Sequence, residues 1–221
     1  MMFRSFRLLV FDWDGTLMDS EARIVGCLQA VITDLQIPDR ESRTLRNIIG
    51  LGLREAISAL YPDADEVFIN RFIERYRHHF LSENHHPARL FPGAKEVLCC
   101  LRDSGYLLAI ATGKGRVGLE RSLDETASKG IFHATRCADE TFSKPHPQML
   151  LDIMAVLDVE PAQTLMIGDT EYDMQMAQQA GTSALAVAYG VHEKERLLLF
   201  KPLACLDNIT DMVPWLKAED Y

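Results

Sequence analysis

The chain has few cysteines, no long apolar run and fewer basic than acidic residues. Its 221 residues include five cysteines, an odd number at spacings that match no zinc pattern. Lysine and arginine total 23 against 32 aspartate and glutamate residues, which gives a net charge of -9. This balance argues against a nucleic-acid or anionic-membrane partner, because such surfaces require a basic face on the protein.

The cysteines and the N-terminus predict a cytoplasmic protein. Cys99 and Cys100 lie in an apolar helical stretch, where thiols are usually buried, and the odd cysteine count favours a reducing compartment. The apolar residues before Asp12 are too few for a signal peptide or a membrane span. Hydrophobic residues make up 48% of the chain, which is enough for a proper core. The oligomeric state stays open.

Short apolar runs alternate with helical patterns along most of the chain. We expect strands at residues 8–11, 107–111, 164–168 and 184–188, and a weaker one at 134–138. We expect helices at 93–101, 146–157 and 172–180, the last with Gly181 as its C-cap. This alternation predicts an α/β fold, a Rossmann-like parallel sheet with helices on both faces. Ligands of such sheets bind at the carboxyl ends of the strands.

Residues 19–88 differ, because they show helical patterns and no obvious strand. Amphipathic stretches cover 22–35, 44–60 and 64–81, with a break at Gly50-Leu51-Gly52. We predict a helical cap domain at 19–88, inserted into a core made of 1–18 and 89–221. Cap opening is expected, with hinges near 18–20 and 86–92.

Two carboxylates directly follow the first predicted strand. Asp12 and Asp14 stand two residues apart, and Gly15 and Thr16 come next. Side chains at this spacing can point the same way at a strand end. Paired carboxylates behind an apolar strand are costly unless a cation, a proton or a reacting electrophile uses them. We therefore favour a catalytic role over an acidic turn.

Three later segments also fall at strand ends. Thr112-Gly113-Lys114 offers a hydroxyl and glycine N–H groups, which suit phosphate oxygens. Lys144 brings a positive charge, and Asp169 and Asp173 lie on a loop that opens a helix, where carboxylate oxygens suit a hard cation. Alone, each segment fits an ordinary turn or helix start. Their common position at strand ends favours one site.

In order and position, these segments resemble the four motifs of the haloacid-dehalogenase (HAD) superfamily, whose members are mostly Mg²⁺-dependent phosphatases. The resemblance runs from Leu8 to about Val187. It is to members with a helical cap between motifs one and two, and among these to the phosphoglycolate-phosphatase type. It implies hydrolysis of a small phosphate monoester, a phosphorylated metabolite such as phosphoglycolate, through an aspartyl-phosphate intermediate.

The resemblance also implies roles for individual residues. Asp12 matches the nucleophile, and Asp14 matches the general acid/base that protonates the leaving oxygen. Thr112 and Lys144 complete the expected catalytic set. The residues expected to bind the substrate phosphate are Thr112, Gly113, Lys144 and Gly15.

The expected cofactor is Mg²⁺. The resemblance implies that Asp12, the main-chain carbonyl of Asp14 and Asp169 bind it, together with water. Asp173 matches a second acidic position, which orients a metal-bound water or Lys144 rather than binding the metal directly.

Several other activities share this scaffold. Haloacid dehalogenation does not use an acid/base two residues after the nucleophile, and phosphonate hydrolysis needs a cap lysine, which residues 19–89 lack. A sugar phosphomutase, an inorganic pyrophosphatase or nucleotidase, and a non-catalytic phosphate-binding module stay open. Residues 47–53 are our candidate for choosing the substrate, although they also fit a plain connection between cap helices.

Overall fold

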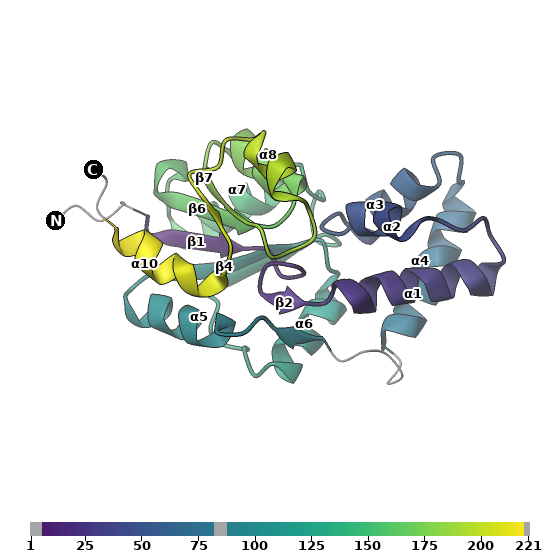
Figure 1. Ribbon diagram of the computed structural model, residues 1–221, viewed down its shortest axis with the longest axis horizontal. Helices are drawn as coiled ribbons and strands as arrows, with labels where there is room; N and C mark the ends of the chain where they lie inside the picture. Colours follow the sequence, from purple (N-terminus) through teal and green to yellow (C-terminus); the bar gives the residue numbers. More distant parts are fainter. Residues whose placement is uncertain (1–5, 82–87, 219–221) are drawn as a thin grey trace.

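The computed structural model describes residues 6–81 and 88–218, which form a six-stranded sheet in the order β5-β4-β1-β6-β7-β8 (Figure 1). Every neighbouring pair is parallel. The strands are β1 (Leu8–Phe11), β4 (Leu107–Thr112), β5 (Ala134–Cys137), β6 (Thr164–Gly168), β7 (Ser183–Val187) and β8 (Cys205–Leu206). This confirms the predicted α/β fold. The strand β8 was not predicted, because two residues are too few to show a pattern.

Helices cover both faces of the sheet. They are α5 (Ala94–Asp103), α6 (Arg116–Glu125), α7 (Gln148–Leu157), α8 (Glu171–Ala180), α9 (Lys194–Leu198) and α10 (Met212–Lys217). Leu9 and Phe11 of β1 share a buried cluster with residues of α5, α6 and α10. Leu8 and Val10 share another with residues of α7 and α8. Because β1 is buried on both faces, its sequence is continuously apolar rather than alternating.

A helical insert lies between β2 (Met18–Asp19) and β3 (Arg89–Leu90), to the right of the sheet in Figure 1. Its helices are α1 (Glu21–Leu35), α2 (Ser42–Asn47), α3 (Leu53–Leu60) and α4 (Glu66–Leu81). The insert has an apolar cluster that includes Leu28, Ile57 and Phe72, and Val191, which follows β7, also belongs to it. The predicted helices are confirmed, and the break at 50–52 separates α2 from α3.

The strands β2 and β3 correct the expectation that residues 19–88 contain no strand, because β2 includes Asp19. Met18 pairs with Leu90 and Asp19 with Arg89 in an antiparallel ladder. The two segments by which the chain passes between the sheet and the insert are therefore hydrogen-bonded to each other. Of the second predicted hinge, 86–92, residues 86 and 87 lie outside the described residues. Within the part of the chain that the structure describes, no helix is long and apolar enough to cross a membrane.

Candidate active site

The predicted motifs meet at one edge of the sheet. The strand β1 lies between β4 and β6, so the loops that follow these three parallel strands are neighbours. Asp12 follows β1, Thr112 ends β4 and Asp169 follows β6. This is the carboxyl edge, where open α/β sheets bind their ligands.

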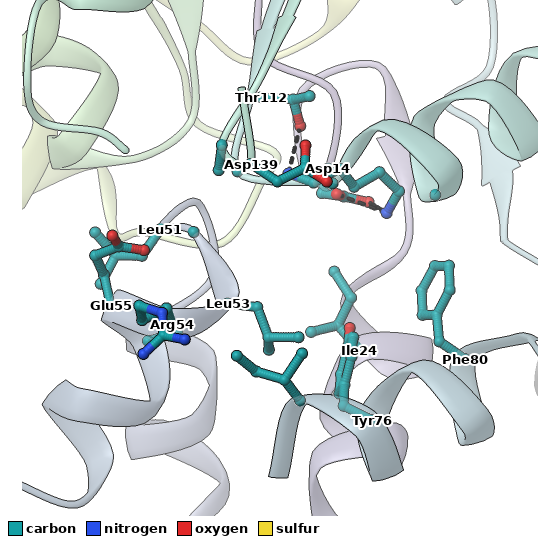
Figure 2. Close-up of a pocket in the computed structure, with 18 of the residues that line it drawn as sticks. Asp14, Ile24, Leu51, Leu53, Arg54, Glu55, Tyr76, Phe80, Thr112 and Asp139 are labelled. Carbon is teal, nitrogen blue, oxygen red and sulfur yellow. Dashed lines mark hydrogen bonds and ion pairs between the residues drawn. The ribbon is translucent and has the colours of Figure 1, made fainter. Parts of the chain in front are cut away.

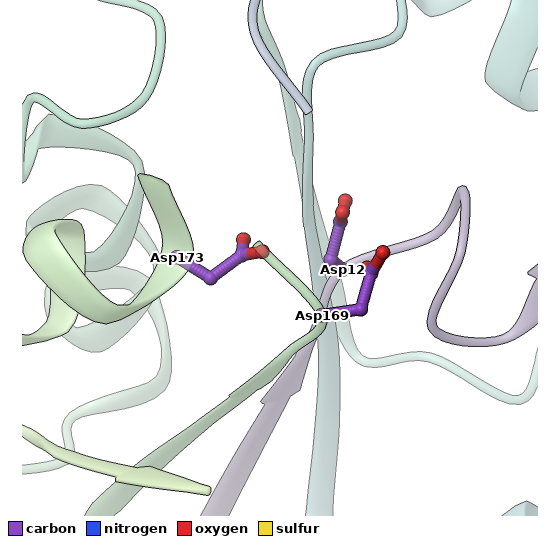
Figure 3. Close-up of side chains that lie close together, drawn as sticks. All are labelled: Asp12, Asp169 and Asp173. Carbon is purple, nitrogen blue, oxygen red and sulfur yellow. The ribbon is translucent and has the colours of Figure 1, made fainter. Parts of the chain in front are cut away.

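Asp12, Lys144, Asp169 and Asp173 form a buried group that we call the charged cluster. Figure 3 shows its three carboxylates, and one oxygen of each lies within 4.8 Å of one oxygen of the others. The Nζ atom of Lys144 lies 2.7 Å from Asp12 Oδ1 and 2.6 Å from Asp173 Oδ1. The Lys144 side chain is 0% exposed. Its charge can be held there because two carboxylates neutralise it.

Burial and mutual repulsion shift the protonation of the charged cluster. Loss of water raises the pKa of Asp12 well above its ordinary value; Lys144 opposes this shift, and the charges of Asp173 and Asp169 add to it. Burial, followed by the charge of Asp173, raises the pKa of Asp169 to about 7. Burial lowers the pKa of Lys144, but Asp12 and Asp173 outweigh it and raise that pKa. Three carboxylates around one ammonium leave negative charge that a cation would balance.

Asp173 is fully engaged with protein groups. Its Oδ1 pairs with Lys144, while its Oδ2 accepts hydrogen bonds from the Thr170 main-chain N–H (3.1 Å) and hydroxyl (2.7 Å). Thr170 and Asp173 form a capping box at the start of α8. The helix start therefore fixes the carboxylate that holds Lys144. That Asp173 orients Lys144 rather than binding the metal directly stays a prediction.

Asp12 keeps one oxygen free, whereas Asp169 is held on both sides. Asp169 Oδ1 accepts a hydrogen bond from the Thr16 hydroxyl (2.7 Å), and its Oδ2 accepts one from the Val191 N–H (2.8 Å). Asp12 Oδ2 is buried and accepts no hydrogen bond from the described residues. A buried carboxylate oxygen without a partner, next to a second carboxylate, fits a hard cation such as Mg²⁺.

Glycines allow the main chain to approach Asp169. A Cβ atom on Gly15 would lie 2.2 Å from Asp169 Oδ2, and one on Gly190 would lie 2.3 Å from Asp169 Cβ. Gly15 also has a φ of +84°, which L side chains rarely adopt. Its N–H donates to the Met18 carbonyl at 2.8 Å. Gly15 thus shapes the loop around Asp169, and its substrate contact stays a prediction.

Asp14 lies apart from the charged cluster and has different partners. The Nζ atom of Lys114 lies 2.7 Å from both of its carboxylate oxygens, and the Ser20 hydroxyl donates to Oδ1 at 2.5 Å. The same ammonium lies 4.7 Å from the ring centre of Phe80, at the end of α4. No role for Lys114 was predicted. Its position two residues after Thr112, at the end of β4, was the available signal.

A cavity of about 710 Å³ separates Asp12 and Asp14 from the helical insert. Figure 2 shows Asp14 and Thr112 on the sheet side, with Leu53 and Tyr76 on the insert side. Within the charged cluster, only Asp12 lines the cavity. Gly113 lines the cavity too. Gly15 and Lys144 do not, so their predicted contacts with the phosphate would have to be made from behind the residues that line it.

The segment predicted to choose the substrate lies against the sheet side of the cavity. The Gly52 N–H donates to the Ser143 hydroxyl at 2.6 Å. A Cβ atom on Gly113 would lie 2.4 Å from the Leu51 carbonyl oxygen, so only glycine fits there. The Tyr172 hydroxyl donates to the Asn47 carbonyl at 2.8 Å. This segment thus closes the cavity beside Thr112 as well as connecting α2 to α3.

The fold and this site are those of a family of hydrolases. The family model described as haloacid dehalogenase-like hydrolase matches residues 9–187, and the chain belongs to that family. A protein of Dickeya dadantii named "Probable phosphatase IndB" is 34% identical over 93% of this chain and 91% of its own length.

Other relatives carry different substrates in their names. A phosphoglycolate phosphatase of Pseudomonas putida is 27% identical over 94% of this chain and 79% of its own. The pyrophosphatase PpaX of Bacillus mycoides is 28% identical over 94% and 95%. The crystal structure of a hydrolase from Pseudomonas syringae has the same fold, with a TM-score of 0.85, 21% identity, and coverage of 96% of this chain and 97% of the other.

Proposed function

We propose that the protein is a Mg²⁺-dependent phosphatase that hydrolyses a small phosphate monoester through an aspartyl-phosphate on Asp12. One observation carries the proposal: Asp12 lines the cavity with a buried carboxylate whose Oδ2 has no protein partner among the described residues. A carboxylate so placed is free to bind a cation and to attack phosphorus. The names of the relatives as phosphatases support the same reaction.

Two steps with opposite proton transfers make up the proposed reaction. Asp12 attacks phosphorus, the bond from phosphorus to the leaving oxygen breaks, and Asp14 donates a proton to that oxygen. Asp14 then removes a proton from water, which attacks the aspartyl-phosphate, releasing inorganic phosphate and restoring Asp12. The separate positions of the two carboxylates support separate roles, because Asp14 pairs with Lys114 and not with the charged cluster.

The remaining residues stabilise charge in this proposal. Lys144 neutralises Asp12 and the phosphate oxygens, held in place by Asp173. Thr112 and Gly113, which line the cavity, offer a hydroxyl and an N–H to the phosphate. Mg²⁺, held by Asp12, Asp169 and the Asp14 main-chain carbonyl, would neutralise the phosphate oxygens when bound.

We also propose that residues 19–88 act as a cap domain on a core of 1–18 and 89–221. An apolar cluster made almost entirely of insert residues, and the antiparallel pairing of β2 with β3 where the chain enters and leaves the insert, support such a unit. Water must reach the cavity after the leaving group departs, so the cap should open at its junction with the core.

The five cysteines form no disulfide, which supports a cytoplasmic location.

Phosphate release tests the proposed reaction directly. The panel contains phosphoglycolate, inorganic pyrophosphate, a nucleoside monophosphate and a hexose phosphate, each with Mg²⁺ or with EDTA. We expect turnover that EDTA abolishes, and a loss of at least roughly 10³-fold in Asp12→Asn, because the nucleophile is removed. Release by folded Asp12→Asn at the unmodified rate would refute the aspartyl-phosphate. Sugar-phosphate isomerisation faster than phosphate release would favour a mutase.

A further inference from the structure

The insert side of the cavity presents an apolar surface to Asp12 and Asp14. We call this surface the apolar wall, and it consists of Leu51, Leu53, Ile73, Tyr76 and Phe80. All five belong to, or pack against, the apolar cluster of the insert. The first four are only partly buried, so they leave apolar atoms facing the cavity. Tyr76 and Phe80 are stacked, with ring centres 5.8 Å apart and planes at 21°.

The cations along the cavity are occupied or exposed. Lys114 pairs with both oxygens of Asp14. Arg54 donates hydrogen bonds to Glu66 at 2.5 Å and to Asn70 at 2.7 Å, and 44% of its side chain is exposed. Arg77 is the remaining cation among the described lining residues, and it is exposed. Among the described residues that line the cavity, no buried cation is therefore left for a second anionic group of the substrate.

Acidic groups offset the two arginines. Glu55 and Asp139 line the same cavity, so beyond Asp12 and the Lys114–Asp14 pair the lining carries two acidic and two basic side chains. An anion taken out of water needs a paired cation to avoid a large desolvation penalty. The second phosphate of pyrophosphate and the carboxylate of phosphoglycolate would both lack such a partner against the apolar wall.

The size of the cavity also favours a large leaving group over a small anionic one. At about 710 Å³, it falls in the range of sites that enclose ligands of drug size. A two-carbon leaving group would leave most of the apolar wall facing water. A flat, uncharged ring system would cover Leu53, Ile73 and Tyr76, and the burial of apolar surface would favour its binding.

We infer that the substrate is a phosphate monoester whose leaving group is a bulky, flat and largely uncharged ring system, about the size of a nucleoside. The inference rests on the proposed phosphatase reaction and narrows its substrate class. The phosphate would lie at Asp12 and the ring system against the apolar wall. Hydrolysis consumes one water and yields inorganic phosphate and the free hydroxyl compound.

Competing substrates test this inference. Values of kcat/KM with Mg²⁺ are measured for 1-naphthyl phosphate, a nucleoside 5′-monophosphate, phosphoglycolate and inorganic pyrophosphate. We expect the nucleoside 5′-monophosphate, an alkyl ester like phosphoglycolate, to exceed both small anions tenfold or more. Because 1-naphthol is a better leaving group in itself, 1-naphthyl phosphate is compared only between the unmodified protein and variants of the apolar wall. Faster turnover of phosphoglycolate or pyrophosphate overturns the inference and leaves the phosphatase proposal standing. No release from any compound by folded protein overturns the phosphatase proposal itself.

A charge placed in the apolar wall gives an independent test. Ile73→Lys and Leu53→Lys should each lower kcat/KM for the preferred ring-bearing ester tenfold or more, while phosphoglycolate loses less or gains. Val67→Lys is the matched control, because Val67 also lies on α4, is 75% exposed and does not line the cavity. Thermal shift with 1-naphthol or the nucleoside adds a readout without turnover: the shift should be lost in folded Leu53→Lys. An unchanged substrate ratio in both wall variants overturns the inference.

Discussion

The two sides of the cavity differ in the chemistry of their side chains. On the sheet side, the charged cluster holds Lys144 at 0% side-chain exposure between two carboxylates. On the insert side, the apolar wall has few charged neighbours, and the side chain of one of them, Arg54, is 44% exposed. Buried charges require matched partners in fixed positions, whereas apolar contacts depend mainly on the area covered. We infer that the sheet side recognises phosphate and the insert side recognises the rest of the substrate.

The largest expected difference between the two sides is in stability. Lys144→Met should lower the free energy of unfolding by roughly 3 kcal/mol and abolish turnover, because Asp12 and Asp173 lose their shared cation. Arg54→Met should change it by less than about 1 kcal/mol, since exposed ion pairs are weak. Urea denaturation of both variants measures the difference. Equal losses of unfolding free energy in the two variants would contradict the predicted difference between the two sides.

The contact of Lys114 with Asp14 and Phe80 lies where the two sides meet. Lys114→Met should lower kcat for an alkyl phosphate about 10²-fold, because Asp14 loses the ammonium that would position it for the proposed proton transfer. The loss should be much smaller for 4-nitrophenyl phosphate, whose leaving group needs no proton. Lys129→Met is the control, because that lysine forms only exposed ion pairs in the described structure. Equal losses for both substrates would indicate a purely structural role.

Metal binding should stabilise the protein through residues of the sheet side alone. Mg²⁺ at 100 times its dissociation constant adds about 2.7 kcal/mol to the free energy of unfolding of a protein with one site. We expect the resulting rise in Tm in the unmodified protein and its near loss in Asp169→Asn. Asp139→Asn should keep the rise, because Asp139 lines the cavity outside the charged cluster. A full rise in Asp169→Asn would place the metal elsewhere.

The smallest expected effect concerns an exposed charge of the insert. A hydrogen bond with His79, and the charge of Arg75, hold the pKa of Asp34 below its ordinary value of 3.8. Since the folded-state pKa is the lower one, the stabilisation is present above pH 3.8 and is lost as the pH falls through the folded-state value. Asp34→Asn should lower Tm at pH 7 by less than about 2 °C. The difference between variant and unmodified protein should shrink as the pH falls below 3.8; a difference that grows in acid would contradict this sign.

Much of the fold was predictable, because long segments repeat their pattern. The apolar runs of β1, β4 and β6 and the periodicity of α1 and α4 predicted elements that the structure confirms. The pair β2–β3 was missed, since two residues show no period. Three of the motifs were found because they lie at the ends of strands on one edge of a parallel sheet, whereas Lys144, seven residues after β5, was found by its place in the motif order.

The sequence by itself determined the family, the parallel sheet and the residues that meet at its carboxyl edge, because these follow from local pattern and motif order. Only the tertiary structure decided which carboxylates share Lys144, which oxygen of Asp12 stays free, and that Lys114 faces both Asp14 and Phe80. These pairings join residues far apart in the chain, as Lys114 and Asp14 do across 100 positions. Such contacts depend on packing, which no local pattern encodes.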